Sequence, residues 1–200
     1  MNWRRIVLWS VAGAALALVI LLAATVRVVE PVTAIAQPQP PARDPASTPP
    51  EGDGRLRVPV AGVDPARLRS NWGDPRGGGR VHQGLDIMAP ANSRVIAAGP
   101  GRVEKLFYSR GGGGIVLYQR SSDGRFSYYY AHLAGYAPGI AEGQALRAGD
   151  LLGYVGDTGN ADKGNYHLHF GVSRMGPQDR WDQGVPIDPY PLLSSAAPAR

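Results

Sequence analysis

The sequence predicts a mainly β protein whose folded part is one compact antiparallel β-sheet domain. The 200 residues include 27 Gly and 18 Pro, with aromatic and β-branched residues between them, which favours short strands and turns over long helices. The length is enough for one domain of ordinary size and a tail. We expect the domain over residues 55–192 and a frayed tail over residues 193–200.

The N-terminal segment is expected to be a single-pass transmembrane anchor over residues 1–29. Residues 6–26 form an uncharged run of 21 residues, long enough to cross a bilayer core of about 30 Å as a helix. Arg4 and Arg5 precede it, which predicts a cytoplasmic N-terminus and a domain outside the membrane. The alternative is a cleaved signal peptide and a secreted protein, because residues 34–36 have the small-x-small form of a cleavage site.

Residues 30–54 are expected to form a Pro-rich extended linker. The segments 37–41 and 47–50 favour polyproline geometry and offer little apolar surface to bury. At about 3.1 Å per residue, such a segment spans several tens of Å. The linker would therefore let a tethered domain reach beyond the membrane surface.

The sequence of the domain predicts short strands separated by turns. The Ser-Ser-Asp-Gly segment at 121–124 has hairpin chemistry. Helical turns are expected at 64–69, where Asp64 would cap and Pro65 would take the first position, and more weakly at 138–143. The expected strands are 56–60, 94–98, 102–108, 114–118, 126–130, 151–156 and 166–170.

Composition also excludes several classes of function. The chain has no cysteine, so it has no disulfides, no thiolate zinc site and no lipid-modified cysteine. The formal charge of +5 suits an anionic polymer or membrane face, but no basic helix or aromatic–basic motif accompanies it, so we expect no nucleic-acid partner. The glycines at 111–114 lack the Lys-Ser/Thr ending of a phosphate-binding loop.

All four histidines of the chain fall in three short segments that suit one metal site. His167 and His169 alternate in a strand and would share one face, with Leu168 and Phe170 turned to the core. A catalytic zinc takes three protein ligands and keeps one position open.

His82 and Asp86 lie four residues apart, with Gly84 between them to allow close backbone approach. We expect them to bind the metal with one histidine of the His-x-His pair, and spacing does not say which. His132 and the remaining histidine would stand beside the open position for proton transfer.

These motifs together resemble those of the LytM-type M23 zinc metallopeptidases. The resemblance runs from about residue 57 to residue 188 and includes the segments 70–73, 84–90, 155–159 and 186–189. It implies a compact antiparallel β domain with the duplicated hybrid motif and a groove over one Zn²⁺ ion. It implies that His82, Asp86 and His169 are the zinc ligands and that His132 and His167 are the catalytic pair.

The implied activity is endopeptidase cleavage of stem peptides or cross-links in bacterial peptidoglycan, in cell-wall remodelling. With the anchor, the expected location is the bacterial inner membrane, with the domain on the periplasmic side. Two alternatives remain: a non-catalytic or latent module that regulates other wall hydrolases through a protein partner, and a zinc peptidase acting on proteins.

Three features depart from the family pattern. Many relatives carry glutamate where this chain has Gly171. The segment 74–81 is shorter than in many relatives and glycine-rich, and Gly164-Asn165-Tyr166 replaces a common Gly-Pro approach to the His-x-His pair. None removes a ligand, so these departures bear on substrate choice.

Overall fold

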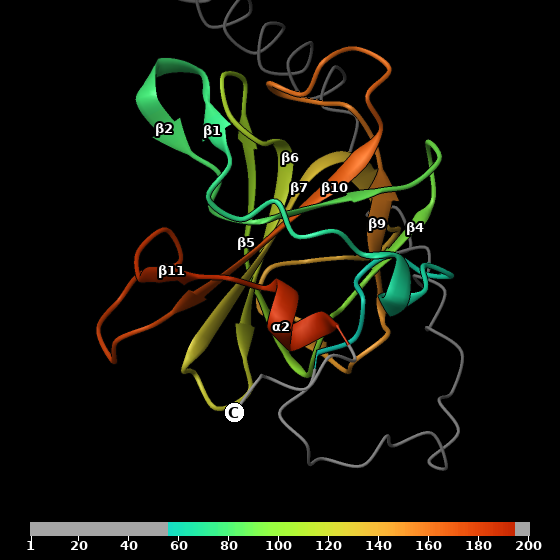
Figure 1. The fold of residues 1–200 in the computed structure, drawn as a ribbon. Helices are drawn as coiled ribbons and strands as arrows, with labels where there is room; N and C mark the ends of the chain where they lie inside the picture. Colours follow the sequence, from blue (N-terminus) through green and yellow to red (C-terminus); the bar gives the residue numbers. More distant parts are fainter. Residues whose placement is uncertain (1–55, 195–200) are drawn as a thin grey trace, which may run out of the picture. The chain divides into compact units, whose positions relative to one another are not determined.

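The computed structural model describes residues 56–194, and Figure 1 shows their fold. The expected anchor, residues 1–29, lies outside the described residues, as does the linker, residues 30–54. Within residues 56–194, no helix is long and apolar enough to cross a membrane.

The described part of the chain is dominated by antiparallel strands, as its composition predicts. Nine of its strands form one sheet, and two more form a small separate hairpin. The hairpin contains β1 (Pro75–Arg76) and β2 (Arg80–Val81), joined by the 3₁₀ turn η2 (Gly77–Gly79). The sheet strands are β3 (Leu85–Met88), β4 (Arg94–Ile96), β5 (Gly101–Ser109), β6 (Gly114–Ser121), β7 (Phe126–Tyr136), β8 (Ala145–Leu146), β9 (Leu151–Val155), β10 (His167–Arg174) and β11 (Val185–Ile187).

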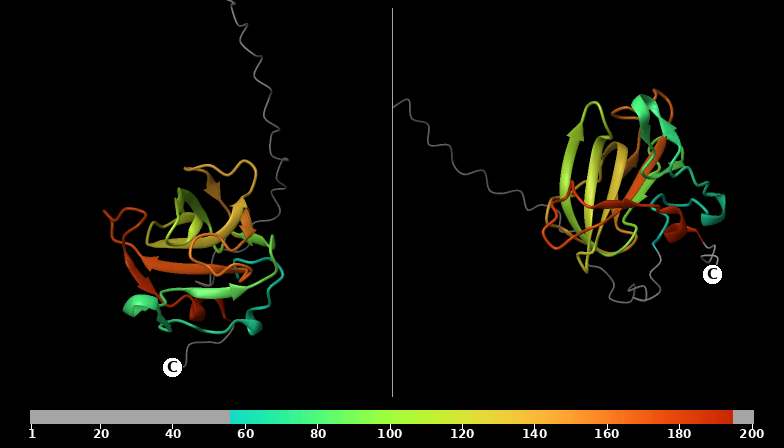
Figure 2. Two further views of the ribbon diagram at one scale, coloured as in Figure 1. Left: turned by 90° about the horizontal axis from the view of Figure 1, so that it is seen from above. Right: turned by 60° about the vertical axis from the view of Figure 1, so that its left-hand side comes forward.

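The sheet is organised around β10, which pairs along its length with three other strands. Its order is β11-β10-β7-β6-β5-β8, with β3 paired to β10, β9 to β7, and β4 to β9. His169 and Phe170 of β10 lie between β3 and β7, where His169 is opposite both Asp86 and Ala131. His167 pairs with Met88 of β3 and makes an isolated bridge to Gly156, so the whole His-x-His segment is held within the sheet. Figure 2 shows the sheet in two further views.

The core lies on the sheet face opposite the histidines. Leu168 and Phe170 are fully buried, as the alternation of β10 predicts. A buried polar network crosses this core: the hydroxyl of Tyr130 donates to Gln119 Oε1 at 2.6 Å and accepts from the amide of Ala98 at 2.9 Å. The largest fully buried apolar side chains are Tyr130, Phe170, Leu85, Ile87, Leu117, Leu133, Leu152 and Leu168.

Several local expectations are confirmed. Residues 65–67 form a 3₁₀ turn, η1 (Pro65–Arg67), in which the Asp64 carboxylate accepts from the amide of Ala66. Residues 121–124 turn between β6 and β7.

Other expectations are wrong. The segment 138–143 forms turns without a helix. The segment 56–60 makes only one bridge, from Val60 to Val95, although Val58 and Val60 are buried. Leu193, expected in a frayed tail, is buried at the end of a short helix, α2 (Tyr190–Leu193), because it packs into the core.

Candidate metal centre and active site

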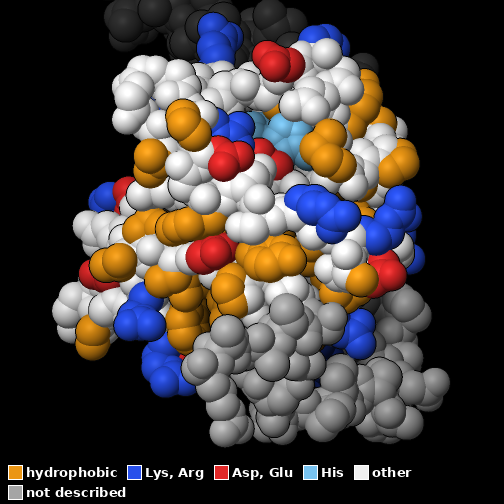
Figure 3. Space-filling view, viewed as in Figure 1, with side chains coloured by type: hydrophobic (Ala, Val, Ile, Leu, Met, Phe, Trp, Pro, Cys, Tyr) orange, Lys and Arg blue, Asp and Glu red, His pale blue; other side chains and the backbone are white. Residues whose placement is uncertain are grey.

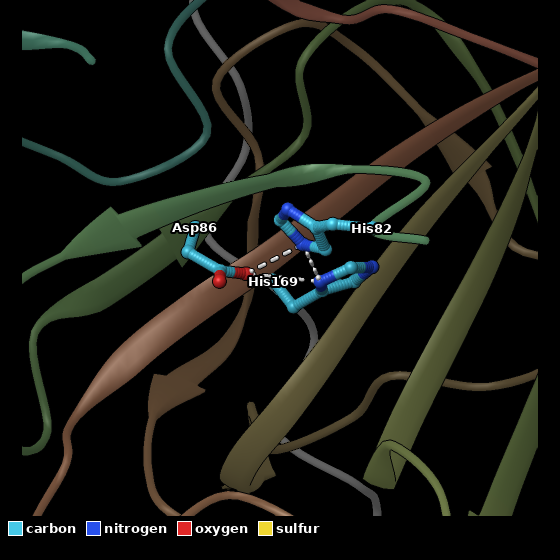
Figure 4. Close-up of side chains that lie close together, drawn as sticks. All are labelled: His82, Asp86 and His169. Atoms are coloured by element: carbon cyan, nitrogen blue, oxygen red, sulfur yellow. Dashed lines mark hydrogen bonds and ion pairs between the residues drawn. The ribbon is translucent and has the colours of Figure 1, made fainter. Parts of the chain in front are cut away.

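His82, Asp86 and His169 come together on the face of the sheet away from the core. Leu85 and Ile87 point into the core from β3, so Asp86 between them points to the other face. The cross-strand register then places His169 directly opposite Asp86. His82, just before β3, is buried beside them, and Figure 4 shows the three side chains converging.

The donor atoms of these three residues form a nearly regular triangle. His82 Nε2 lies 2.9 Å from His169 Nδ1 and 3.0 Å from Asp86 Oδ1, and His169 Nδ1 lies 3.0 Å from Asp86 Oδ1. Zinc–ligand bonds of about 2.0–2.1 Å in a tetrahedron place ligand atoms about 3.3 Å apart. The triangle therefore fits a zinc ion after an expansion of a few tenths of an ångström.

The protonation states around the triangle also suit a cation. His82 Nδ1 lies 2.8 Å from the carbonyl oxygen of Asn71, which only accepts, so Nδ1 carries the proton and Nε2 offers a lone pair. Burial lowers the pKa of His82. Burial alone would raise the pKa of Asp86, but the His169 ring and the Arg76 guanidinium beside its carboxylate outweigh burial and hold that pKa well below its usual range. A neutral imidazole and an ionised carboxylate are the forms that bind metal.

Gly84 leaves the space that the His169 ring occupies. A Cβ at this position would lie 2.6 Å from both Cε1 and Nε2 of His169, and 2.9 Å from the carbonyl oxygen of Phe170. Any side chain at residue 84 would therefore push the His169 ring out of the triangle. This is the close approach that the sequence predicts for the glycine between His82 and Asp86.

His132 and His167 stand together beside the triangle, with ring centroids 4.8 Å apart. The Nδ1 of His132 donates to the carbonyl of Thr158, and the Nδ1 of His167 donates to the carbonyl of Asn165, each at 2.8 Å. Each ring therefore keeps its Nε2 free to accept a proton, and His167 Nε2 lies 3.9 Å from Asp86 Oδ1. Burial lowers the pKa of His132 to about 4, so its imidazole is neutral near pH 7.

All five predicted site residues line one open pocket of about 700 Å³. Figure 3 shows histidine atoms in a hollow of the surface, with acidic and basic side chains beside them. The rim includes Arg76 and Arg80 of the β1–β2 hairpin, the loop glycines Gly112 and Gly113, and the segment 160–165.

Comparison with known proteins agrees with this geometry. The family model described as peptidase family M23 matches residues 80–189, which is more than half of the chain. The chain belongs to peptidase family M23. The resemblance drawn from the sequence motifs is thereby confirmed.

The relatives of this M23 domain include peptidoglycan endopeptidases. The chain is 36% identical over 132 residues to the L-Ala–D-Glu endopeptidase of Bacillus subtilis. The aligned region covers 62% of this chain and 39% of that protein. It is 30% identical over 123 residues to the peptidoglycan DD-endopeptidase ShyC of Vibrio cholerae, covering 59% of this chain and 27% of that protein. The chain thus spans well under half the length of these two relatives.

The fold agrees with a solved M23 structure. The catalytic domain of lysostaphin, an antimicrobial peptidase from Staphylococcus simulans, superposes with a TM-score of 0.54 at 26% identity, covering 64% of this chain and 92% of that domain. The predicted antiparallel β domain is confirmed.

The M23 domain also uses residues to which sequence reasoning assigned no role. Asn71 accepts from the amide of Asp86 at 3.2 Å through Oδ1 and donates to Asp86 Oδ2 at 3.1 Å through Nδ2. Arg76 also donates to Asp86 Oδ2. These contacts orient the Asp86 carboxylate, as outer partners of metal ligands do. Asn71 lies in the segment 70–73, which is part of the family resemblance, and this was the one feature of the sequence that could have indicated its role.

Thr158 supports His132. Its hydroxyl donates to the carbonyl of Leu133 at 2.8 Å and accepts from the amide of Ile115 at 3.0 Å, while its carbonyl receives His132 Nδ1–H. His132 itself has a left-handed backbone with φ of 60°, at an irregularity in the pairing of β7. The four-glycine loop packs directly against Thr158. A Cβ on Gly114 would lie 2.2 Å from the Thr158 hydroxyl oxygen, so the glycine leaves the space that this hydroxyl occupies.

Proposed function

We propose that this chain is a zinc-dependent metalloendopeptidase that hydrolyses peptide bonds in peptidoglycan stem peptides or cross-links. The observation that carries the proposal is the triangle of His82, Asp86 and His169 beside two further histidines whose Nε2 atoms are free. Membership of family M23 and the peptidoglycan endopeptidases among the relatives support it.

The triangle would hold the ion through His82 Nε2, Asp86 Oδ1 and His169 Nδ1. When bound, zinc supplies Lewis acidity that polarises a peptide carbonyl and lowers the pKa of a water molecule toward about 7. Asn71 and Arg76 keep the second oxygen of Asp86 engaged, so that Oδ1 faces the other two donors.

His132 and His167 would carry out the proton transfers. Each has its Nδ1 proton fixed on a backbone carbonyl, so Nε2 accepts a proton from the attacking water and later returns it to the leaving amine. An imidazole protonated at Nε2 also stabilises the charge that develops on the attacked carbonyl oxygen. Both rings are buried and close together, so little reorganisation is needed.

We further propose that residues 1–29 hold this domain at the bacterial inner membrane, on the periplasmic side, with residues 30–54 as the spacer. The support is the uncharged run after Arg4 and Arg5. A tethered enzyme of this kind would work on the wall layer within reach of the linker.

The test is release of peptide from purified peptidoglycan by the full chain, with detergent present. We expect new peptide ends that disappear when a chelator is added and return when zinc is restored. The His132→Ala variant should keep its zinc and release nothing. Absence of release by the zinc-loaded wild-type chain would contradict the proposal and favour a regulatory module that acts through other hydrolases.

A further inference from the structure

Four aromatic side chains form a continuous row that leads away from the metal centre. The ring of Tyr129 lies 5.8 Å from that of His169 and 4.7 Å from that of Tyr118. Trp181 continues the row at 4.8 Å from Tyr118, and Phe107 at 5.5 Å from Trp181. We name Tyr129, Tyr118, Trp181 and Phe107 the aromatic row.

The strand register places this row on the same sheet face as the metal centre. Tyr129 in β7 is opposite Gly171 in β10 on one side and Tyr118 in β6 on the other. In β5, Lys105 is the cross-strand partner of Tyr118, and Phe107 lies two residues after Lys105, so Phe107 is on the same face. With strands about 4.8 Å apart, the row extends about 14 Å from β10 to β5, the length of about four extended residues.

The row does not belong to the hydrophobic core. The core cluster and the partly buried side chains packed against it include none of its four members. Phe107 is 43% exposed, and Tyr118, Tyr129 and Trp181 each keep part of their surface open to solvent. Partly exposed apolar surface of this kind, continuous with a pocket, marks binding sites.

The row meets the pocket at Tyr129, whose cross-strand neighbour in β10 is Gly171, a residue without a side chain. Tyr129 itself lines the pocket. A Cβ on Gly171 would lie 3.4 Å from the Cβ and 3.5 Å from the Cδ1 of Tyr129. This is the position at which the chain departs from the glutamate of many relatives, and the glycine leaves the side of Tyr129 uncovered.

Besides its ring contacts with Tyr118 and Phe107, Trp181 lies in a loop that is anchored two residues earlier, at Asp179. The β10–β11 connection carries it over the sheet, and the buried guanidinium of Arg120 donates to the carbonyl of Asp179 at 3.0 Å. Arg120 is fixed in turn by two hydrogen bonds to Glu104, at 2.7 and 2.9 Å. The Asp179 carboxylate accepts from the amide of Gly176 at 2.6 Å. A ring held in advance loses little entropy when a ligand stacks on it.

We propose that the aromatic row is a subsite for a sugar ring of the peptidoglycan strand, and the inference rests on the proposed function. A pyranose ring presents a flat face of C–H groups and a polar edge, which suits open aromatic faces bordered by charged side chains. Lys105, the cross-strand partner of Tyr118, places a charged group beside the row, where it is ion-paired with Glu142 at 2.8 Å. An aliphatic peptide side chain would need an enclosed apolar pocket, whereas this surface is open. The substrate would therefore be a peptide still attached to its glycan.

The test compares two substrates with the same stem peptide, one free and one attached to its N-acetylated disaccharide. For the zinc-loaded full chain, we expect kcat/KM to be at least about tenfold higher for the glycan-linked peptide, which corresponds to 1.4 kcal/mol. Trp181→Ala should bring this ratio close to one. Gly171→Glu should do the same, because its side chain would cover Tyr129.

The matched control is Tyr108→Ala. Tyr108 is 59% exposed and neighbours Phe107 in β5 but points to the other face, so its removal should leave the ratio unchanged. A wild-type ratio near one, or a ratio that survives both Trp181→Ala and Gly171→Glu, would overturn the subsite.

Failure of the proposed function gives a different result, because the wild-type chain would then cleave neither substrate. In that case binding of the free disaccharide, measured by calorimetry, decides the inference. Binding that is lost in Trp181→Ala supports the subsite, and equal or absent binding in both proteins refutes it.

Discussion

Replacing Gly84 by alanine tests the shape of the metal centre without removing a donor atom. The added Cβ would lie 2.6 Å from two ring atoms of His169 and 2.9 Å from the backbone carbonyl of Phe170. Carbon atoms in contact prefer about 3.5–4.0 Å, so the His169 ring must move by about 1 Å. Ligand distances in a zinc site tolerate only about 0.2 Å, so Nδ1 would leave the triangle.

Two effects follow and are measured separately. Forcing a methyl group into a packed site costs about 1–3 kcal/mol, which denaturant unfolding of the metal-free protein would detect. Zinc affinity should fall by at least about 10–100-fold, as it does when the partners that orient a ligand are removed. A competition titration against a chromophoric chelator gives the affinity.

The matched control is Gly135→Ala in β7. Nothing lies within 4 Å of a Cβ at that position, and its φ is in the ordinary range, so zinc affinity and stability should stay near the wild-type values. Wild-type zinc affinity in Gly84→Ala would refute the claim that this glycine makes room for the ligand.

Three further changes probe the supports of the site. Asn71→Ala removes two hydrogen bonds to Asp86, so zinc affinity measured by chelator competition should fall by about 10–100-fold; an unchanged affinity would show that Arg76 alone orients the carboxylate. Thr158→Val leaves the amide of Ile115 and the carbonyl of Leu133 without their hydroxyl partner, so the free energy of unfolding should fall by about 1–3 kcal/mol and kcat should fall by a larger factor than KM changes. Thr158→Ser keeps the hydroxyl and should retain most of the stability and of kcat. Equal kinetics in the two variants would count against the support that Thr158 gives to His132. Tyr130→Phe deprives Ala98 and Gln119 of a partner and should cost about 1–3 kcal/mol in denaturant unfolding with kcat/KM unchanged in the folded protein; a full loss of activity would contradict a purely structural role.

The parts of the fold and site that the sequence predicts are those governed by local patterns. Alternation predicts that Leu168 and Phe170 are buried while His167 and His169 share the other face, and both statements hold in β10. The even spacing predicts that His82 and Asp86 share a face and a metal site, and their donor atoms lie 3.0 Å apart.

The missed features depend on pairings between distant segments. Thr158 supports His132 only because the loop after β9 meets the start of β6, and no local pattern encodes that meeting. The left-handed backbone of His132 arises where the register of β7 shifts, which a β-propensity pattern does not show. The packing of Trp181 on Tyr118 likewise depends on the path of the β10–β11 connection.

The most direct test of the central claim is the zinc content of matched histidine variants, measured by elemental analysis of the purified full chain. His167 and His169 lie two residues apart in the same strand, yet only His169 completes the triangle with His82 and Asp86. We expect one zinc per chain in the wild type and in His167→Ala, and loss of zinc in His169→Ala. Retention of zinc in His169→Ala with its loss in His167→Ala would contradict the assignment of ligands and catalytic residues alike.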